Sequence, residues 1–264
     1  MSKKLGFALG AGGSRGVTHI GFLKAMEECG ITPDYVSGTS MGSVVGSCYA
    51  KGLTPDYMAD IVKQLKFSDL LDLSINPISN SAILRSQKIQ NKLKQYLGES
   101  KFSELKIPFR CVATDIEEGK VKVFGENPND IVYTAVAASS TIPSIFKPVV
   151  IDDVQYVDGG VLCRVPIQTV RDMGADVIVA VDVLGAVRKT QKKLNVFTIS
   201  WRAFEIVDAS HTRYKVMEQK PDLYIVPDLG DMSQLKFKDI DKAIEIGYKT
   251  GMEYADKIKK LLEE

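Results

Sequence analysis

The sequence predicts an α/β fold, because short apolar strands alternate with segments of helical periodicity. The run from Leu5 to Leu9 is typical of a buried strand, and a helical pattern follows it directly. The same order recurs where Tyr35 to Ser37 precedes the small apolar residues 43–50. With 264 residues the chain can bury a large core, so we expect a single α/β domain over residues 1–264.

The first predicted strand ends in a glycine-rich loop, Gly10-Ala11-Gly12-Gly13-Ser14-Arg15-Gly16, before a helix that Gly30 is expected to end. Such a loop exposes backbone N–H groups to an anion, either a nucleotide phosphate or the oxyanion of an acyl-transfer reaction. A dinucleotide motif would need glycine in place of Arg15 and an acidic residue after the second strand, whereas Asp34 precedes that strand. No Gly-Lys-Ser/Thr follows, so the pattern is not a P-loop either. The spacing therefore favours the oxyanion.

The second predicted strand runs into Gly38-Thr39-Ser40-Met41-Gly42, a G-x-S-x-G pentapeptide. A serine in a tight strand-to-helix turn has a strained backbone and presents its hydroxyl at a helix N-terminus, which makes it a candidate nucleophile. Gly38 and Gly42 are then required because a Cβ would clash with the neighbouring strand or helix. The alternative is an ordinary glycine-rich turn. If the two strands are parallel neighbours, both loops meet at the carboxyl edge of the sheet, where such sheets bind ligands.

A histidine is one possible base for Ser40, and the chain has two histidines, His19 and His211. His19 lies within the first predicted helix and is expected to hydrogen-bond to nearby backbone. His211 lies in the helical-looking segment 201–216 and would complete a triad in the order Ser40, Asp158, His211. The triad therefore stays open as an alternative.

A carboxylate is the other possible base, since burial near a serine raises its basicity. Asp158 ends the extended apolar run that contains Tyr156 and precedes Gly159 and Gly160. Asp-Gly-Gly by itself is a common hairpin turn. Together with the glycine loop and the G-x-S-x-G pentapeptide, it makes Asp158 the candidate base of a Ser-Asp dyad.

Four sequence blocks in this order resemble the patatin-like phospholipases, a family of Ser-Asp acyl hydrolases. The similarity extends from Leu5 to about Val183. The blocks are Gly12-Gly13-Ser14-Arg15-Gly16 with Thr18-His19-Ile20-Gly21, Gly38-Thr39-Ser40-Met41-Gly42, Ser139-Ser140-Thr141-Ile142-Pro143 with Phe146 and Pro148, and Asp158-Gly159-Gly160 with Val165-Pro166.

The resemblance implies a three-layer α/β/α fold with a mostly parallel central sheet. It also implies a lipid acyl hydrolase that cleaves acyl ester bonds of phospholipids or related lipids, with Ser40 as nucleophile and Asp158 as base. The oxyanion hole falls on Gly12, Gly13, Ser14, Arg15, Gly16 and Met41, with N–H donors expected from Gly12, Gly13 and Met41. A lipid or acyl-ester substrate is the expected partner.

The chain departs from the family pattern at three places. Ala11 replaces the first glycine of the loop, Ala137 replaces an arginine, and Cys163-Arg164 replaces an Asn pair. None of these changes touches the dyad, so they bear on substrate and anion contacts. Arg15 is expected either to bind anionic charge such as a lipid phosphate or to form a structural salt bridge.

Two other functional classes remain open. One is a carboxylesterase or thioesterase that uses a Ser-His-Asp triad with His211. The other is a non-catalytic regulatory protein that binds an acyl lipid in the same pocket, and intact Ser40 and Asp158 argue against it. No cofactor and no metal are expected, because no His/Cys/Asp cluster has ligand spacing.

The composition is that of a globular enzyme. The net charge of +1 gives no electrostatic reason to expect nucleic acid as a partner. The scattered cysteines predict reduced thiols and a cytoplasmic protein, and no apolar run resembles a signal peptide or a membrane span. Lys257, Lys259 and Lys260 offer one route to transient contact with a membrane surface, but the mixed charges around them favour a solvated face.

The remaining elements follow in chain order. Thr54-Pro55-Asp56 begins a helix that is expected to end near Phe67. Residues 69–85 form either a cap over Ser40 or a packed connector. Further on we expect a helix over 86–97, strands over 109–116, 121–124, 176–183 and 222–226, and a terminal helix over 237–262.

Overall fold

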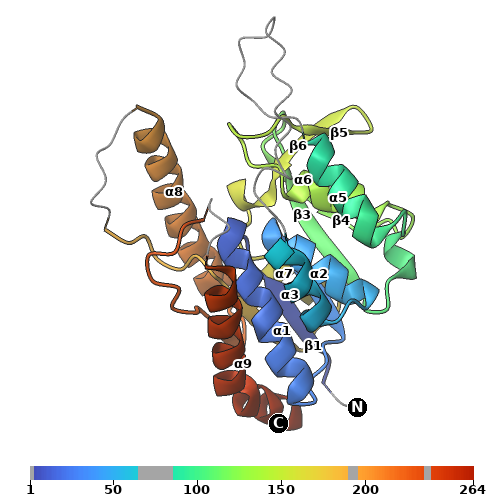
Figure 1. Cartoon of the computed structure of the whole chain (residues 1–264), viewed down its shortest axis with the longest axis vertical. Coiled ribbons are helices and arrows are strands. Elements are labelled where there is room, and N and C mark those ends of the chain that lie inside the picture. The colour runs from blue at the N-terminus through green and yellow to red at the C-terminus, as the bar shows by residue number, and fades with distance from the viewer. Residues whose placement is uncertain (1–2, 65–85, 190–195, 235–238) are drawn as a thin grey trace, which may run out of the picture.

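A computed structural model describes residues 3–64, 86–189, 196–234 and 239–264. The described residues form an eight-stranded sheet in the order β5-β6-β3-β2-β1-β7-β8, with β4 paired to β3. Helices cover both faces of this sheet (Figure 1). The predicted α/β/α architecture with a mostly parallel central sheet is therefore confirmed.

The centre of the sheet is parallel and one side of it is antiparallel. The parallel strands are β1 (Leu5–Leu9), β2 (Tyr35–Thr39), β3 (Phe109–Asp115), β7 (Val177–Val181) and β8 (Leu223–Ile225). The antiparallel strands are β4 (Lys120–Phe124), β5 (Val149–Ile151) and β6 (Val154–Asp158). Because β1 and β2 are parallel neighbours, the loops that follow them lie at the same edge, as the sequence predicted.

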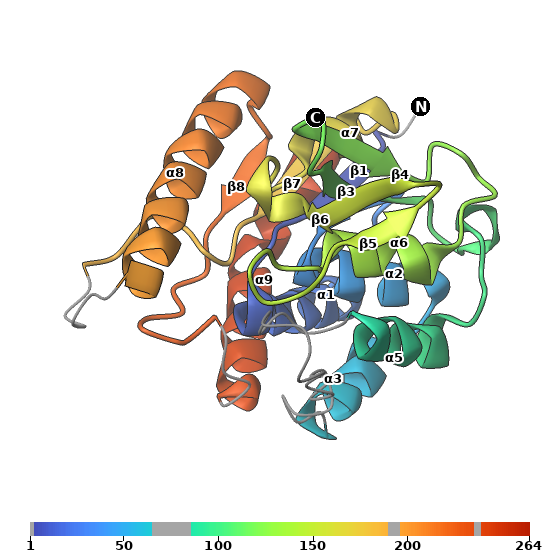
Figure 2. The same ribbon diagram turned by 90° about the horizontal axis from the view of Figure 1, so that it is seen from above.

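One face of the sheet carries most of the helices (Figure 2). These are α1 (Thr18–Glu28), α2 (Met41–Lys51), α3 (Pro55–Gln64), α5 (Gln87–Leu97), α6 (Val132–Ser139) and α9 (Ile240–Glu263). The other face carries α7 (Ile167–Asp172) and α8 (Val196–Gln219). Short 3-10 turns are η1 (Gly13–Val17), η2 (Phe102–Glu104) and η3 (Gly159–Val161). The expected end of α3 near Phe67 and the expected cap over 69–85 lie outside the described residues.

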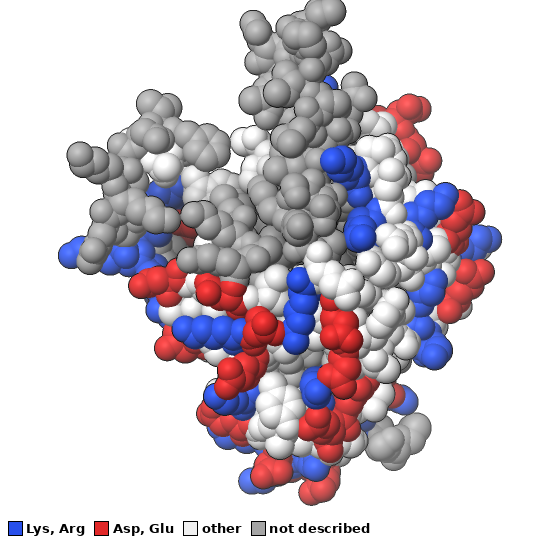
Figure 3. Space-filling model, viewed as in Figure 1, with Lys and Arg blue, Asp and Glu red and all other residues white. Residues whose placement is uncertain are grey.

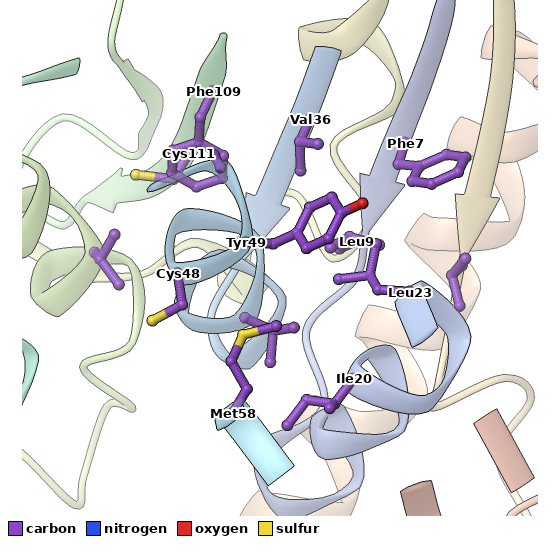
Figure 4. Packing of buried hydrophobic residues seen from close by; sticks show 14 of the residues in the cluster. Phe7, Leu9, Ile20, Leu23, Val36, Cys48, Tyr49, Met58, Phe109 and Cys111 are labelled. Atoms are coloured by element: carbon purple, nitrogen blue, oxygen red, sulfur yellow. The ribbon is translucent and has the colours of Figure 1, made fainter. Parts of the chain in front are cut away.

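Strand β1 shows why the centre of the sheet is stable. All five of its residues are buried, as expected for a parallel strand with helices on both faces. Phe7 and Leu9 point to the face of α1 and α2, where they meet Leu23 and Tyr49 (Figure 4). Ala8 faces the opposite side and belongs to a second apolar cluster. The alternation of side chains along β1 thus builds two cores from one strand.

Helices α1 and α9 pack with their backbones almost in contact. A Cβ placed on Gly21 of α1 would lie 1.9 Å from the carbonyl oxygen of Ile244, and one on Gly247 of α9 would lie 2.0 Å from that of Thr18. Only glycine permits this approach. The C-terminal helix is therefore fastened to the helix that follows the glycine loop.

The face in Figure 3 mixes charges of both signs over its visible surface. On α9, Lys249 pairs with Glu245, and Asp241 pairs with Lys63 of α3. Mixed charge of this kind is typical of a solvated surface.

The chain's four cysteines are all free thiols.

Candidate active site

Ser40 sits in a strained turn between β2 and α2. Its backbone has φ 54° and ψ −126°, a conformation that non-glycine residues rarely adopt. Strain of this kind costs about 1–3 kcal/mol and is found where function requires it. A Cβ on Gly42 would lie 2.2 Å from the carbonyl oxygen of Leu9, so the turn needs glycine there. The backbone at Ser40 thus has the tight strand-to-helix geometry predicted from the pentapeptide.

The Ser40 hydroxyl donates a hydrogen bond to Asp158. The distance from Ser40 Oγ to Asp158 Oδ2 is 2.6 Å, and the Gly160 N–H donates to Oδ1 at 2.7 Å. Ser40 is 5% exposed and Asp158 is 6% exposed. Asp158 is the last residue of β6, and its own N–H donates to the carbonyl of Thr141 at 2.8 Å. Each carboxylate oxygen therefore has one partner in a fixed direction.

Burial makes Asp158 a stronger base than an exposed aspartate. Loss of hydration raises its pKa from 3.8 to about 6, and the negative charge of Asp208 acts in the same direction. Hydrogen bonds from Ser40 and Gly160 act against this rise. The carboxyl group is thus ionised at pH 7, yet its basicity is close to that of a histidine.

The glycine loop and α2 present backbone donors beside Ser40. In the described part of the chain, the N–H groups of Gly12, Gly13 and Met41 have no acceptor. Met41 is the first residue of α2, where helix geometry leaves the N–H free. Gly13 has φ 52°, and a Cβ on it would lie 2.3 Å from the Gln234 carbonyl oxygen. The loop therefore needs glycine at this point.

Other residues predicted for the oxyanion hole have different contacts. The Ser14 N–H donates to the Gln234 carbonyl at 2.8 Å, and the Arg15 N–H donates to the Gly12 carbonyl at 3.0 Å. Gly16 lies against Met41, because a Cβ on it would lie 2.5 Å from the Met41 Cβ. These residues shape the loop, and the N–H groups of Ser14 and Arg15 already have acceptors.

Neither histidine forms a hydrogen bond with the Ser-Asp pair in the described part of the chain. His19 is fully buried with Nε2 2.8 Å from the Gly10 carbonyl oxygen, and burial lowers its pKa to about 4, so the ring is neutral. This matches the structural role expected for it. His211 lies on α8, and among the described residues it has no hydrogen bond to Ser40 or Asp158. The geometry gives no support to the triad alternative.

The contacts of Ser139 and Arg164 at the site have no signal in the sequence. The Ser139 hydroxyl accepts the Ser40 N–H at 3.0 Å, which helps to hold the strained turn. Arg164 is buried and pairs with Asp182 at 2.7 Å and with Asp208 at 3.0 Å. The Arg164 carbonyl also accepts the Ala11 N–H at 2.8 Å. Sequence reasoning placed Ser139 and Arg164 in recognisable blocks but had no means to find partners so distant along the chain.

Ser40 forms part of the wall of a largely apolar cavity of about 160 Å³. Helices α1, α2, α3 and α5 and the turn after α6 supply most of the lining, which includes Val45, Met58, Leu93, Ile142 and Phe146. Gly13 and Met41 line the same cavity. A ligand carbonyl held at Ser40 would thus have room for an apolar tail beside it.

The fold and the site together define an α/β/α protein with a Ser-Asp pair at the carboxyl edge of its sheet. The sequence profile described as Patatin-like phospholipase matches residues 7–171. An uncharacterized NTE family protein of Mycobacterium tuberculosis is 35% identical over 185 residues, which make up 70% of this chain and 50% of that protein. Lysophospholipase NTE1 of Pyricularia oryzae is 25% identical over 288 residues, covering 97% of this chain and 19% of that protein.

Among solved structures, VipD from Legionella pneumophila shares the fold with a TM-score of 0.63 at 14% identity, over 97% of this chain and 67% of VipD. The chain belongs to the patatin-like phospholipase family, because the family profile covers more than half of its residues. The family resemblance seen in the sequence is thereby confirmed. The chain spans about half the length of the mycobacterial relative and about a fifth of the fungal one.

Proposed function

We propose that the protein is a serine lipid acyl hydrolase that works through a Ser40-Asp158 dyad. One observation carries the proposal: Ser40 lies in the wall of an apolar cavity, and its Oγ donates a 2.6 Å hydrogen bond to Asp158 Oδ2. Family membership supports the same reaction class. The substrates are acyl esters of phospholipids or related lipids.

In the acylation step, Asp158 Oδ2 takes the Ser40 proton as Oγ attacks the acyl carbonyl carbon. The N–H groups of Gly12, Gly13 and Met41 hold the oxyanion of the tetrahedral intermediate, with the positive end of α2 beside it. Asp158 then gives its proton to the leaving alcohol oxygen. The C–O ester bond breaks, and the acyl group stays on Ser40.

In the deacylation step, Asp158 takes a proton from water as the water attacks the acyl-Ser40 carbonyl. The second tetrahedral intermediate collapses, the fatty acid leaves, and the proton returns to Ser40 Oγ. The apolar cavity holds the acyl chain in both steps. Each methylene buried there contributes about 0.8 kcal/mol to binding, so longer chains should be better substrates until the cavity is full.

The proposed substrates are lipids, so the protein is expected to meet them at a membrane. To reach a substrate in a bilayer, the protein must bind transiently to the membrane surface. This membrane contact and the cytoplasmic location both remain predictions. None of the helices within the described ranges is long and apolar enough to cross a bilayer. A relative is named Lysophospholipase NTE1, which makes lysophospholipids the first substrates to test.

The test is release of fatty acid from lysophosphatidylcholine and phosphatidylcholine, measured by mass spectrometry. Ser40→Ala should lower turnover by about three or more powers of ten, because no acyl-enzyme can form. It should also abolish labelling by a fluorophosphonate probe. Ser47→Ala is the matched control, since the Ser47 hydroxyl donates to the Val44 carbonyl within α2 and does not line the cavity. This variant should stay within a few-fold of wild type.

Two results would contradict this function. Full activity in a folded Ser40→Ala variant would remove Ser40 as the nucleophile. Acyl-lipid binding without turnover in the wild-type protein would favour the non-catalytic binding class instead. Circular dichroism of each variant separates loss of chemistry from loss of fold.

A further inference from the structure

A second cavity lies at the point where the sheet changes its winding direction. Strand β1 has β2 on one side and β7 on the other. The chain leaves β1 through α1 on one face, and leaves β7 through α8 on the opposite face (Figure 2). Loops that diverge in this way open a crevice at the carboxyl ends of the strands, which is a common ligand site in open α/β sheets.

The cavity has a volume of about 170 Å³ and is separate from the apolar one beside Ser40. Its walls are Arg15 from the loop after β1, residues 183–188 after β7, and Val226, Pro227 and Leu229 after β8. The lining of the first cavity is largely apolar, whereas this one contains two guanidinium groups, those of Arg15 and Arg188.

Arg15 is held in place but keeps donors for a ligand. Its Nε donates to the Met232 carbonyl at 2.7 Å, which fixes the plane of the guanidinium. Within the described part of the chain, its terminal Nη groups have no hydrogen-bond partner and it forms no ion pair. The expected structural salt bridge of Arg15 is therefore not found there. Donors of a half-buried guanidinium that no described protein group occupies are open to water or to an anion.

Arg188 adds a second positive charge to the same cavity. One of its nitrogens pairs with Asp228 on an exposed part of the surface at 2.5 Å. The described ranges of the chain show no partner for its remaining donors. Burial lowers the pKa of Arg15, and the charge of Arg188 lowers it further, so the two cations lie close enough to repel. Glu205 and Asp231 act on Arg15 in the opposite sense, but neither pairs with it.

We propose that this cavity is a phosphate-binding site in which Arg15 and Arg188 hold the phosphate oxygens. Two guanidinium forks match the charge and the planar donor geometry that a phosphate group requires. The site adjoins the proposed catalytic one, since Gly13 and Ser14 line the first cavity and Arg15 lines the second. The phosphate belongs either to the headgroup of a lipid bound at Ser40 or to a separate phosphorylated molecule.

Direct binding tests the site without reference to catalysis. Isothermal titration of the full-length Ser40→Ala protein with inorganic phosphate and with glycerol 3-phosphate should show saturable binding at roughly millimolar affinity or better. Arg188→Gln should weaken that binding by at least about tenfold. Arg213→Gln removes a charge from an exposed position on α8 and should leave the affinity unchanged. Arg188→Lys keeps the charge without the fork and should fall between wild type and Arg188→Gln.

A kinetic comparison in the active protein identifies the source of the phosphate, and this arm rests on the proposed function. If the headgroup occupies the site, Arg188→Gln should lower kcat/KM for lysophosphatidylcholine about tenfold relative to a monoacylglycerol of the same chain length. If a separate molecule occupies it, that ratio should stay constant while glycerol 3-phosphate binding is lost.

Absence of saturable phosphate binding, or equal affinity in wild type, Arg188→Gln and Arg213→Gln, would overturn the site. Failure of the proposed function would look different. No lipid would then be hydrolysed, while the titrations with phosphate would still give an answer.

Discussion

At the scale of single residues, the proposed chemistry depends on one hydrogen bond between residues that lie 118 positions apart in the chain. Asp158 receives Ser40 Oγ on one oxygen and the Gly160 N–H on the other, so its carboxylate cannot turn away. Ser40 is held from the opposite side by Ser139, which accepts its N–H. Both members of the pair are therefore oriented before a substrate binds, which is the condition for efficient proton transfer.

Asp158→Asn should lower ester turnover by about two to four powers of ten, because the amide keeps the shape and removes the base. His211→Ala should stay within a few-fold of wild type. In the wild-type protein, kcat/KM should rise with pH through about 6, since Asp158 must be ionised to take the proton and its pKa is raised to about 6. Turnover of p-nitrophenyl esters measures all three. A folded His211→Ala variant as inactive as Asp158→Asn would replace the dyad by a triad.

Asp158→Asn should also make the protein more stable at neutral pH. Asp158 titrates near 6 in the folded protein and near 3.8 when unfolded, so the unfolded chain ionises first as pH rises. Stability is lost between these two values, and above pH 6 the loss levels off at about 3 kcal/mol. Urea unfolding of wild type and Asp158→Asn at pH 4 and pH 8 measures this. Equal stability differences at both pH values would contradict the raised pKa.

At the scale of elements, residues 163–166 connect four parts of the fold. The carbonyl of Arg164 accepts the Ala11 N–H of the glycine loop, and the carbonyl of Cys163 accepts the Thr39 hydroxyl of β2 at 2.9 Å. The Arg164 side chain reaches Asp182 after β7 and Asp208 on α8. The departure from the family pattern at Cys163-Arg164 is thus explained by structure: this segment fastens the glycine loop, the strand before Ser40 and α8 to one another.

Arg164→Met should destabilise the protein by about 3–5 kcal/mol, because it leaves two carboxylates without their cation in a buried setting. Arg110→Met is the matched control. Its pair with Glu126 is 3.9 Å long and the Glu126 carboxylate is exposed, so loss of this pair should cost no more than about 1 kcal/mol. Thermal and urea unfolding compare the two. A loss below about 1 kcal/mol in Arg164→Met would show that the buried network does not hold the elements together.

At the scale of the whole molecule, the proposed reaction needs only groups of this chain. Asp158 moves the proton, and backbone N–H groups stabilise the oxyanion. We therefore expect ester hydrolysis to be unchanged in EDTA or EGTA, measured with the same p-nitrophenyl substrates before and after dialysis. A large loss that calcium restores would show that an ion takes part in catalysis.

The parts of the molecule that sequence reasoning predicted are those encoded by short stretches of chain. The glycine loop, the turn at Ser40 and the strand that ends at Asp158 each impose a local backbone requirement, which glycine spacing and apolar runs reveal. The partners of Arg164 and the contact of Ser14 with Gln234 could not be predicted, because their elements meet only after the sheet has formed. Helix and strand ends shifted by a few residues for the same reason, as at β7, which is shorter than the predicted 176–183.

The close packing of α1 against α9 has a consequence for the order of events in the cell. Ribosomes release a chain from its N-terminus, so the glycine loop, Ser40 and Asp158 emerge before α9 is made. Before α9 is made, the surface of α1 at Gly21 has no helix packed against it. The glycine loop before α1 also lacks its hydrogen bonds to Met232 and Gln234 until those residues have been made. If Ser40 and Asp158 act as proposed, their site would be completed only when α9 has been made and packed against α1. We therefore expect hydrolysis to begin only after the end of α9 has left the ribosome.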